Sequence, residues 1–389
     1  MYIIIVKERK NGEMRVAATP GEVRAYINAG SQVGVEEGAG LASGFSDDAY
    51  RNAGAHMATR EVLNKFVERM SERDPFNAAV IKVKEILPDE YALVARGVPI
   101  IGFGHLAANR NLVDQVISRG GTYVSLEDIV EEMPAPHRPA LAAMSRIAGE
   151  ESMRLAMRHT PDAYKASMRE VIIIGYGNVG QAAHRVAVED FGLRRVTVFD
   201  TAVTKGQLDH FFSYYDPEDG RHYSKYAPNT IASYIADARE ADGFSKTNPC
   251  IVILAPYSPE GRTPMLITSE LAKTFPLGSV IVDVSIDQGG ACEFSQATSH
   301  AQPHRDVHGV RYIGIPNIPG AVPERSTPAF AESVKPYVAE MARFGFHGSL
   351  RRSVALRGAV SLHNGAITSK GLAETFALSH TPIDEALPA

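Results

Sequence analysis

The clearest sign of a chemical function in this chain is a set of three glycines that follows a short apolar run. Gly175, Gly177 and Gly180 have the spacing GxGxxG and come directly after residues 171–174, four consecutive β-branched residues. In this spacing the first glycine permits a tight turn, the second lets the backbone approach a pyrophosphate, and the third lets the following helix pack closely on the strand. The pattern predicts a phosphate-binding turn between a buried strand and a helix.

The residues that follow continue the order of a dinucleotide-binding unit. A helix over residues 179–188 would direct the free N–H groups of its first turn, at Asn178 and Val179, toward a phosphate. A second strand, Arg195 to Phe199, ends at Asp200, 25 positions after the first glycine (200 − 175). This is close to the roughly 20 residues expected before a ribose-binding carboxylate. Glycine turns also serve packing alone, but the complete order favours NAD binding. The carboxylate would repel the 2′-phosphate of NADP.

Composition limits the classes of function. The chain has 389 residues, for which two domains are expected, with 44% hydrophobic and 22% charged residues. A net charge of −5 offers no basic surface for nucleic acid. Two cysteines, Cys250 and Cys292, are too few for a disulfide framework and fit a reducing compartment. The apolar start, Tyr2 to Val6, is too short for a signal peptide or a membrane span. We therefore expect a cytoplasmic protein without a membrane partner.

Short apolar runs alternate with helical patterns along the whole chain, which is typical of a parallel α/β fold. Thr19 before Pro20 marks one helix start, and Ser46 marks another. The expected strands cover residues 2–6, 32–35, 79–83, 99–103, 122–124, 171–174, 195–199, 251–255, 280–284 and 312–315.

A proline-rich stretch, residues 131–139, marks the expected crossing between two doubly wound domains. We expect a Rossmann NAD-binding domain at residues 141–321, and a discontinuous substrate and catalytic domain formed by residues 1–140 and 322–389. The helical segment 326–344 would return the chain to that first domain.

Several polar residues stand where the apolar pattern would not place them. Lys82 and Lys84 alternate with apolar residues, which predicts that both face the same side. A solvent-exposed edge of the sheet that carries lysines would explain the same pattern equally well. His105 directly follows a strand, at the end where open α/β sheets bind ligands, and it can exchange a proton near neutral pH. Asp287 follows the strand 280–284 in the same way. Together with the glycine turn, these two strand-end residues favour a catalytic interpretation.

Two other features favour less specific interpretations. His300, His304 and His308 recur every four residues, but Pro303 interrupts the interval, so incidental loop histidines are favoured over a metal site, and we expect no metal. The polar and aromatic segment after Asp200 could be a substrate lid or a partner contact, although a surface loop with a few packed aromatic rings is favoured.

Ordered short motifs run through the sequence, and together they resemble the alanine dehydrogenase and pyridine nucleotide transhydrogenase family. They are Lys7-Glu8, Arg15-Val16-Ala17 with Thr19-Pro20, Glu36-Glu37-Gly38-Ala39-Gly40 with Ser43-Gly44-Phe45, Lys82-Val83-Lys84-Glu85, His105-Leu106-Ala107-Ala108, Met144-Ser145 with Ile147-Ala148-Gly149, Asp283-Val284-Ser285-Ile286-Asp287-Gln288-Gly289-Gly290, Asn317-Ile318-Pro319-Gly320-Ala321-Val322-Pro323 with Ser326-Thr327, and Leu362-His363-Asn364-Gly365.

The resemblance implies two α/β domains with an active site in the cleft between them, NAD on the second domain, and a homo-oligomer. By similarity, Arg15 and Lys84 would bind the carboxylate and carbonyl of a 2-oxo acid, and His105 would be the acid/base. Asp287 would help organise the reacting centre, and Asn317 would lie near the nicotinamide. Two cations suit a carboxylate and a polarised carbonyl, and a histidine suits the proton that accompanies imine formation or hydrolysis.

Three activities are compatible with this resemblance. The leading one is an NAD-dependent amino-acid dehydrogenase that interconverts a small L-amino acid, such as alanine, with its 2-oxo acid and ammonia by hydride transfer. A second is an opine- or saccharopine-type dehydrogenase, which joins a 2-oxo acid to the amine of an amino acid. The third is an NAD-binding component of a transhydrogenase, which would have no amino-acid substrate.

Overall fold

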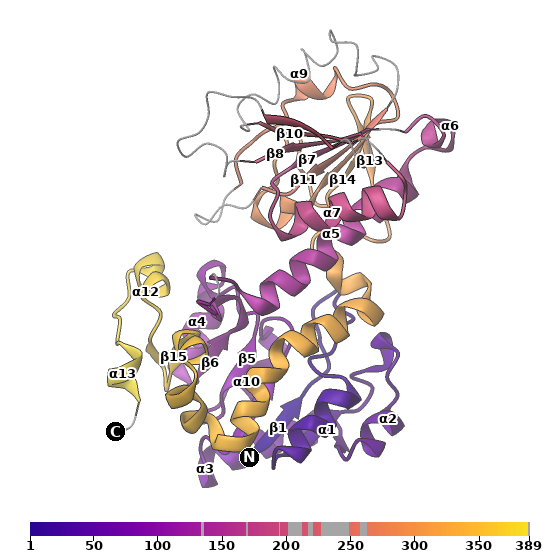
Figure 1. The fold of residues 1–389 in the computed structure, drawn as a ribbon. Helices are drawn as coiled ribbons and strands as arrows, with labels where there is room; N and C mark the ends of the chain where they lie inside the picture. Colours follow the sequence, from indigo (N-terminus) through magenta and orange to yellow (C-terminus); the bar gives the residue numbers. More distant parts are fainter. Residues whose placement is uncertain are drawn as a thin grey trace. The chain divides into compact units, whose positions relative to one another are not determined.

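The computed structural model describes residues 1–133, 136–168, 170–193, 195–200, 249–256 and 263–387, together with the backbone of two strands at 212–216 and 221–226. The chain forms two compact units, one from Met1–Met144 with Gly320–Ala389 and the other from Ser145–Pro319 (Figure 1). The boundaries expected from the sequence, after residues 140 and 321, lie close to these points. Most of the segment after Asp200, and residues 257–262, lie outside the described residues.

The described residues of the first unit form an eight-stranded sheet in the order β16-β15-β6-β5-β4-β1-β2-β3. Its strands are β1 (Tyr2–Ile5), β2 (Gln32–Glu36), β3 (His56–Ala58), β4 (Ala78–Ile81), β5 (Ile100–Gly102), β6 (Tyr123–Ser125), β15 (Val360–His363) and β16 (Ala366–Ile367). Its helices are α1 (Pro20–Asn28), α2 (Asp47–Asn52), α3 (Arg60–Arg73), α4 (Arg110–Ser118), α10 (Pro323–Arg352), α11 (Val354–Gly358), α12 (Lys370–Phe376) and α13 (Ile383–Ala386).

Local sequence signals account for the ends of several of these elements. The predicted cap of α1 is confirmed, because the Thr19 hydroxyl accepts from the backbone N–H of Gly21, and Glu22 completes a capping box. Ser46 caps α2 as predicted. The apolar residues of β1 are buried, which places this strand in the middle of the sheet. Helix α10 packs beside α1 and changes direction at Gly345, whose φ is +72° (Figure 1).

The strand order of this sheet has a switch point at β1. Strands β1 to β6 are parallel, with β2 on one side of β1 and β4 on the other. In an open parallel sheet the connections leave in opposite directions at such a switch point, so that ligands bind beyond the carboxyl ends of the strands there. The segments that follow β1, β4, β5 and β6 therefore meet at one edge.

The described residues of the second unit form a sheet in the order β13-β14-β12-β11-β7-β8-β10-β9. Its strands are β7 (Glu170–Ile174), β8 (Arg195–Phe199), β9 (Phe212–Asp216), β10 (Arg221–Tyr226), β11 (Cys250–Leu254), β12 (Val280–Asp283), β13 (Arg305–Val307) and β14 (Val310–Ile313). Its helices are α6 (Asp162–Lys165), α7 (Asn178–Glu189) and α9 (Ser269–Ala272), and α5 (Pro139–His159) contains the boundary between the units.

Alternate residues of β7 pack on opposite sides of this sheet. Val171 and Ile173 belong to the core beneath α5 and α7, whereas Ile172 and Ile174 belong to the core that includes α9. Figure 1 shows α7 and α9 on opposite faces of these strands. The predicted two-domain α/β fold, with a doubly wound second domain, is confirmed.

Candidate active site

The loops at the carboxyl edge of the first sheet carry most of the candidate side chains. Arg15 lies in the segment after β1, Lys84 follows β4, and His105 follows β5. Because β1, β4 and β5 are neighbouring parallel strands, their following segments converge, although they are far apart in the sequence. The three residues that the sequence singled out are therefore gathered at one edge.

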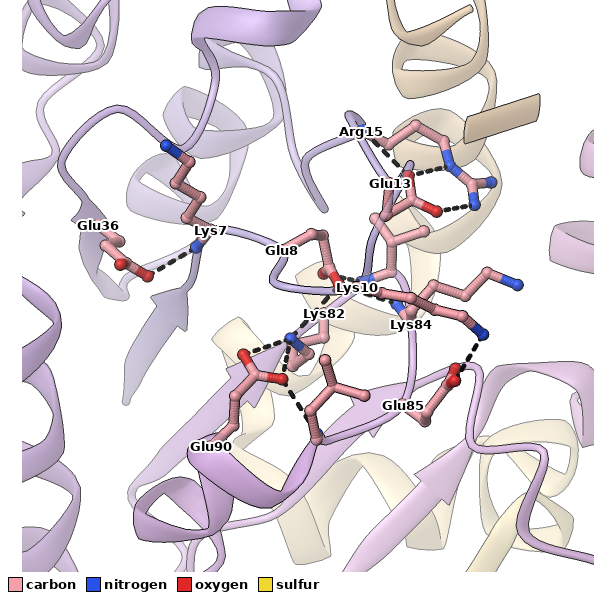
Figure 2. A network of polar contacts seen from close by, with 12 residues as sticks. Lys7, Glu8, Lys10, Glu13, Arg15, Glu36, Lys82, Lys84, Glu85 and Glu90 are labelled. Carbon is pink, nitrogen blue, oxygen red and sulfur yellow. Dashed lines mark hydrogen bonds and ion pairs between the residues drawn. The ribbon is translucent and has the colours of Figure 1, made fainter. Parts of the chain in front are cut away.

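The prediction that Lys82 and Lys84 share one face is wrong. Strand β4 ends at Ile81, so the strict alternation of a strand does not extend to the two lysines. The ammonium of Lys82 is fully buried and lies 2.8 and 2.9 Å from the carboxylate oxygens of Glu90 and 3.3 Å from that of Glu8. Figure 2 shows Lys82 directed toward Glu90 and Lys84 directed away from it. Lys82 is thus a buried structural cation and not part of a solvated edge.

Further ion pairs extend this buried cluster. Arg60 donates to Glu90 and to Glu36, and Glu36 also accepts from Arg9 and from the backbone N–H of Lys7. Because each buried carboxylate here has a cationic partner, the segment after β1 is tied to β2 and to the end of β4. The cluster reaches the backbone of Lys84, whose N–H donates to Glu8.

Lys84 is placed differently from Lys82. Its ammonium lies 3.4 Å from Nε2 of His105, and among the described residues no carboxylate oxygen lies within 4 Å of it. Burial lowers the pKa of Lys84, and the neighbouring cations Arg15 and Lys10 lower it further. A half-buried cation beside other cations attracts an anion or a carbonyl oxygen. Among the candidate side chains of the first unit, Lys84 is therefore the one best suited to bind an oxygen atom of a ligand.

Arg15 is already engaged by a carboxylate that sequence reasoning missed. Its Nε lies 2.7 Å from one oxygen of Glu13, and Nη2 bonds the other. Both side chains are buried, and Figure 2 shows the two groups face to face. Nη1 of Arg15 is directed to the sulfur of Met144, 2.8 Å away. Glu13 therefore orients the guanidinium and offsets its charge, so that Nη1 is the part directed away from this pair.

His105 has an unusual backbone conformation. Its φ is +42° and its ψ is +38°, a left-handed region that non-glycine residues seldom occupy. The imidazole is exposed and lies parallel to the ring of Phe103, with 6.1 Å between the ring centres. Such strain persists only where neighbouring groups hold it, and it is frequent at functional sites.

Glu127, which the sequence did not single out, contacts the backbone beneath His105. Its carboxylate accepts the N–H of His105 at 2.7 Å and that of Gly104 at 3.1 and 3.2 Å. It follows β6, the strand next to β5, which explains why it reaches this loop. Burial raises the pKa of Glu127 to about 7, although the backbone N–H donors act in the opposite direction.

The three glycines of the predicted motif have different surroundings in the second unit. A Cβ on Gly175, whose φ is +90°, would lie 2.3 Å from the carbonyl oxygen of Ala255, and a Cβ on Gly180 would lie 2.0 Å from that of Gly175. A Cβ on Gly177 would meet no atom within 4 Å. The first and third glycines thus permit close packing, whereas the second leaves open space at the start of α7.

The other predicted cofactor-binding residues of this region lie around the glycine loop. Asn178 and Val179 begin α7, so their N–H groups have no partner within the helix. Asp200 directly follows β8, and its Oδ2 accepts the N–H of Tyr176 at 2.6 Å, which ties the acid to the glycine loop. The Tyr176 hydroxyl lies 2.5 Å from Nδ1 of His184 on α7. Sequence reasoning missed this last pair.

The remaining candidates also follow parallel strands of the second sheet. Asp287 is exposed in a 3₁₀ helix, Val284–Gln288, after β12. Asn317 follows β14 and has a φ of +56°. Since β7, β8, β11, β12 and β14 are parallel, the glycine loop, Asp200, Asp287 and Asn317 all lie toward the same edge of this sheet.

Among the described residues, no group of three or more His, Cys, Asp or Glu side chains is arranged to hold a metal ion. His308 lies in the turn between β13 and β14, and the ring of His304 contacts that of His159. Within the same described ranges, no helix is both long and apolar enough to cross a membrane.

Comparison with known proteins covers nearly the whole chain. Residues 4–148 match the family model "Alanine dehydrogenase/PNT, N-terminal domain", and residues 153–370 match its C-terminal counterpart. An alanine dehydrogenase of Bacillus subtilis is 35% identical over 403 residues, covering 100% of this chain and 98% of that protein. Alanine dehydrogenase 1 of Staphylococcus aureus is 32% identical, covering 98% and 99%.

Solved structures give the same relation. A structure of L-alanine dehydrogenase has a TM-score of 0.78 and 31% identity, and the match covers 97% of this chain and 99% of that one. A transhydrogenase from Sinorhizobium meliloti has a TM-score of 0.72 at 22% identity, covering 95% and 100%, and so shows likeness of fold.

Proposed function

This chain belongs to the alanine dehydrogenase and pyridine nucleotide transhydrogenase family, and on that premise we propose that it is an NAD-dependent amino-acid dehydrogenase. It interconverts a small L-amino acid, such as alanine, with its 2-oxo acid and ammonia. The observation that carries this proposal is Lys84, a half-buried cation without a carboxylate partner in the described part of the chain, 3.4 Å from the imidazole of His105. A cation and a proton carrier side by side suit a carbonyl carbon that gains or loses an amine.

The site residues of the first unit have separate tasks in this proposal. Lys84 binds the carbonyl oxygen of the 2-oxo acid and polarises it. Arg15, oriented by Glu13, directs Nη1 toward the substrate carboxylate. The imidazole of His105 holds and moves the proton that accompanies addition or loss of water at the imine carbon, because its ordinary pKa lies near neutral pH.

The glycine loop fits a dinucleotide. The open space over Gly177 is where a pyrophosphate would approach the backbone, and the N–H groups of Asn178 and Val179 would donate to it. Asp200 would accept the ribose 2′-hydroxyl, and Asp287 and Asn317 would lie near the nicotinamide. Bound NAD supplies the carbon centre that accepts or donates the hydride.

The direct test is a substrate panel measured by NADH oxidation at 340 nm. Pyruvate and other small 2-oxo acids are each combined with ammonium, lysine, ornithine or alanine. We expect the fastest oxidation with pyruvate and ammonium. Faster oxidation with an amino acid as the amine would support an opine- or saccharopine-type enzyme instead. No oxidation with any 2-oxo acid and amine, together with tight NADH binding, would support a transhydrogenase component.

We propose in addition that the enzyme is a cytoplasmic homo-oligomer. Cys250 and Cys292 are both buried free thiols, which supports a reducing compartment. Light scattering coupled to size-exclusion chromatography measures the assembly. A mass of 42.1 kDa, that of a single chain, would contradict the oligomer.

A further inference from the structure

We propose that Glu127 is the positioning residue for His105, because its carboxylate accepts the two successive N–H groups of Gly104 and His105 and so holds this loop in its left-handed conformation. This inference rests on the proposed function, in which the imidazole of His105 moves a proton. Glu127 itself contacts the backbone and not the imidazole, so its action on the reaction is indirect.

The geometry of the loop supports a holding role. The left-handed φ of +42° at His105 is costly for a residue with a Cβ. Leu106, the next residue, is buried, and with the Glu127 contacts it fixes both sides of the strained residue. Without the carboxylate, the N–H groups of Gly104 and His105 would lose their acceptor, and the loop could relax toward a more common conformation. The imidazole would then move relative to Lys84.

The charge on Glu127 governs how firmly the loop is held. A carboxylate accepts N–H groups more strongly than a neutral carboxyl does. Ionisable groups around Glu127 are Asp128 on its own 3₁₀ helix, Tyr123 on β6 and His105 on the loop it supports. Since burial raises its pKa to about 7, Glu127 gains a proton as the pH falls through neutrality. The hold on His105 should weaken over that same range.

The effect of Glu127 on folding stability agrees with a functional role for its carboxylate. A carboxyl group whose pKa is higher in the folded state favours folding when it is protonated, and this contribution is lost as the pH rises from about 4.5 to about 7. Above pH 7 the charged form therefore costs the fold stability. A position selected for stability alone would favour a neutral side chain here.

The experiment uses Glu127→Gln, Glu127→Ala and a matched control, Asp114→Asn, an exposed carboxylate paired with Arg110 on α4. For each full-length protein, the pH dependence of kcat and the dissociation constant of NADH are measured. The amide shift of His105 is followed by NMR on 15N-histidine-labelled protein without substrate, and is assigned with a His105→Gln sample.

We expect Glu127→Ala to lower kcat on the order of 10- to 100-fold, with NADH binding within about twofold of the wild type. Glu127→Gln keeps one acceptor oxygen, so it should restore part of this loss. It should also remove one ionisation from the acidic limb of the kcat profile. The titration of the His105 amide near pH 7 should be the same in Asp114→Asn as in the wild type, whereas Glu127→Gln should lose the part caused by Glu127 and keep only the part caused by the imidazole of His105.

Two results would overturn the inference. One is a His105 amide that titrates near pH 7 in Glu127→Gln as it does in the wild type. The other is an acidic limb of kcat that is the same in Glu127→Gln and the wild type. The amide titration needs no substrate, so it tests the contact even where Glu127→Ala fails to fold. If the wild type oxidised no NADH with any 2-oxo acid, the proposed function would fail, while the amide titration would still report on Glu127.

Discussion

The first unit has a polar edge, formed by Arg15, Lys84 and His105, and the second unit has the glycine loop. Both lie at the carboxyl ends of parallel strands, but the polar edge depends on side chains and the glycine loop on the backbone. In the proposed function the edge acts through side-chain charge, with Lys84 beside His105 and Arg15 held by Glu13. The loop acts through backbone shape, because Gly175 and Gly180 permit contacts that a Cβ would prevent. Substitutions at the edge should therefore alter turnover and its pH dependence, whereas those at the loop should alter stability or cofactor affinity.

The largest effect should come from Lys84→Met, with Lys82→Met as its matched control. Removal of the Lys84 cation should lower kcat/KM for the 2-oxo acid roughly 10³-fold, with NADH binding unchanged. Removal of Lys82 leaves Glu8 buried without its cation and leaves Glu90 with Arg60 alone, and should destabilise the fold by about 3–5 kcal/mol. Steady-state kinetics and denaturant unfolding measure the two effects. If the two variants lost turnover and stability to the same extent, the distinction between the lysines would be wrong.

Next in size is the contrast between two alanine substitutions in the glycine loop. Gly180→Ala places a Cβ 2.0 Å from a backbone oxygen, so it should destabilise the second unit by about 2–4 kcal/mol. Gly177→Ala meets no atom within 4 Å, so it should fold like the wild type but bind NADH more weakly. Thermal unfolding without cofactor and NADH titration separate the two. Normal NADH affinity in Gly177→Ala would argue against a pyrophosphate over this residue.

The smallest of these effects concerns cofactor choice. Asp200→Ala removes the expected acceptor for the ribose 2′-hydroxyl and the repulsion of a 2′-phosphate, so it should weaken NADH binding about 10-fold and improve relative binding of NADPH. The loss of the hydrogen bond from the N–H of Tyr176 contributes to the change. Fluorescence titration with both cofactors measures it. An unchanged preference for NADH would remove Asp200 from cofactor discrimination.

Much of the fold follows from local sequence signals. Four β-branched residues ahead of a glycine turn predict a buried strand, and β7 contains all four. Thr19 and Pro20 predict the start of α1. The hairpin of β15 and β16 also had a signal that sequence reasoning did not use. Its two-residue turn is Asn364-Gly365, with positive φ at both positions, as a tight hairpin requires.

The supporting groups of the site could not be found in the same way. Glu127 reaches His105 because β5 and β6 are neighbours, and strand order is not encoded in local periodicity. The same holds for Lys82, whose partners Glu8 and Glu90 follow different strands. Glu13 lies two residues from Arg15, but nothing in its loop distinguishes it from a solvated glutamate. Sequence patterns thus indicated the residues proposed to contact ligands, but not the groups that hold these residues in place.

The central claim is that His105 carries the proton for the reaction while the glycine loop binds the cofactor independently. The most direct measurement is made on one preparation of His105→Ala, by NADH titration followed by stopped-flow NADH oxidation with pyruvate and ammonium. We predict an NADH dissociation constant within about twofold of the wild type and a hydride-transfer rate lower by a factor on the order of 10³. A rate equal to that of the wild type would contradict the claim.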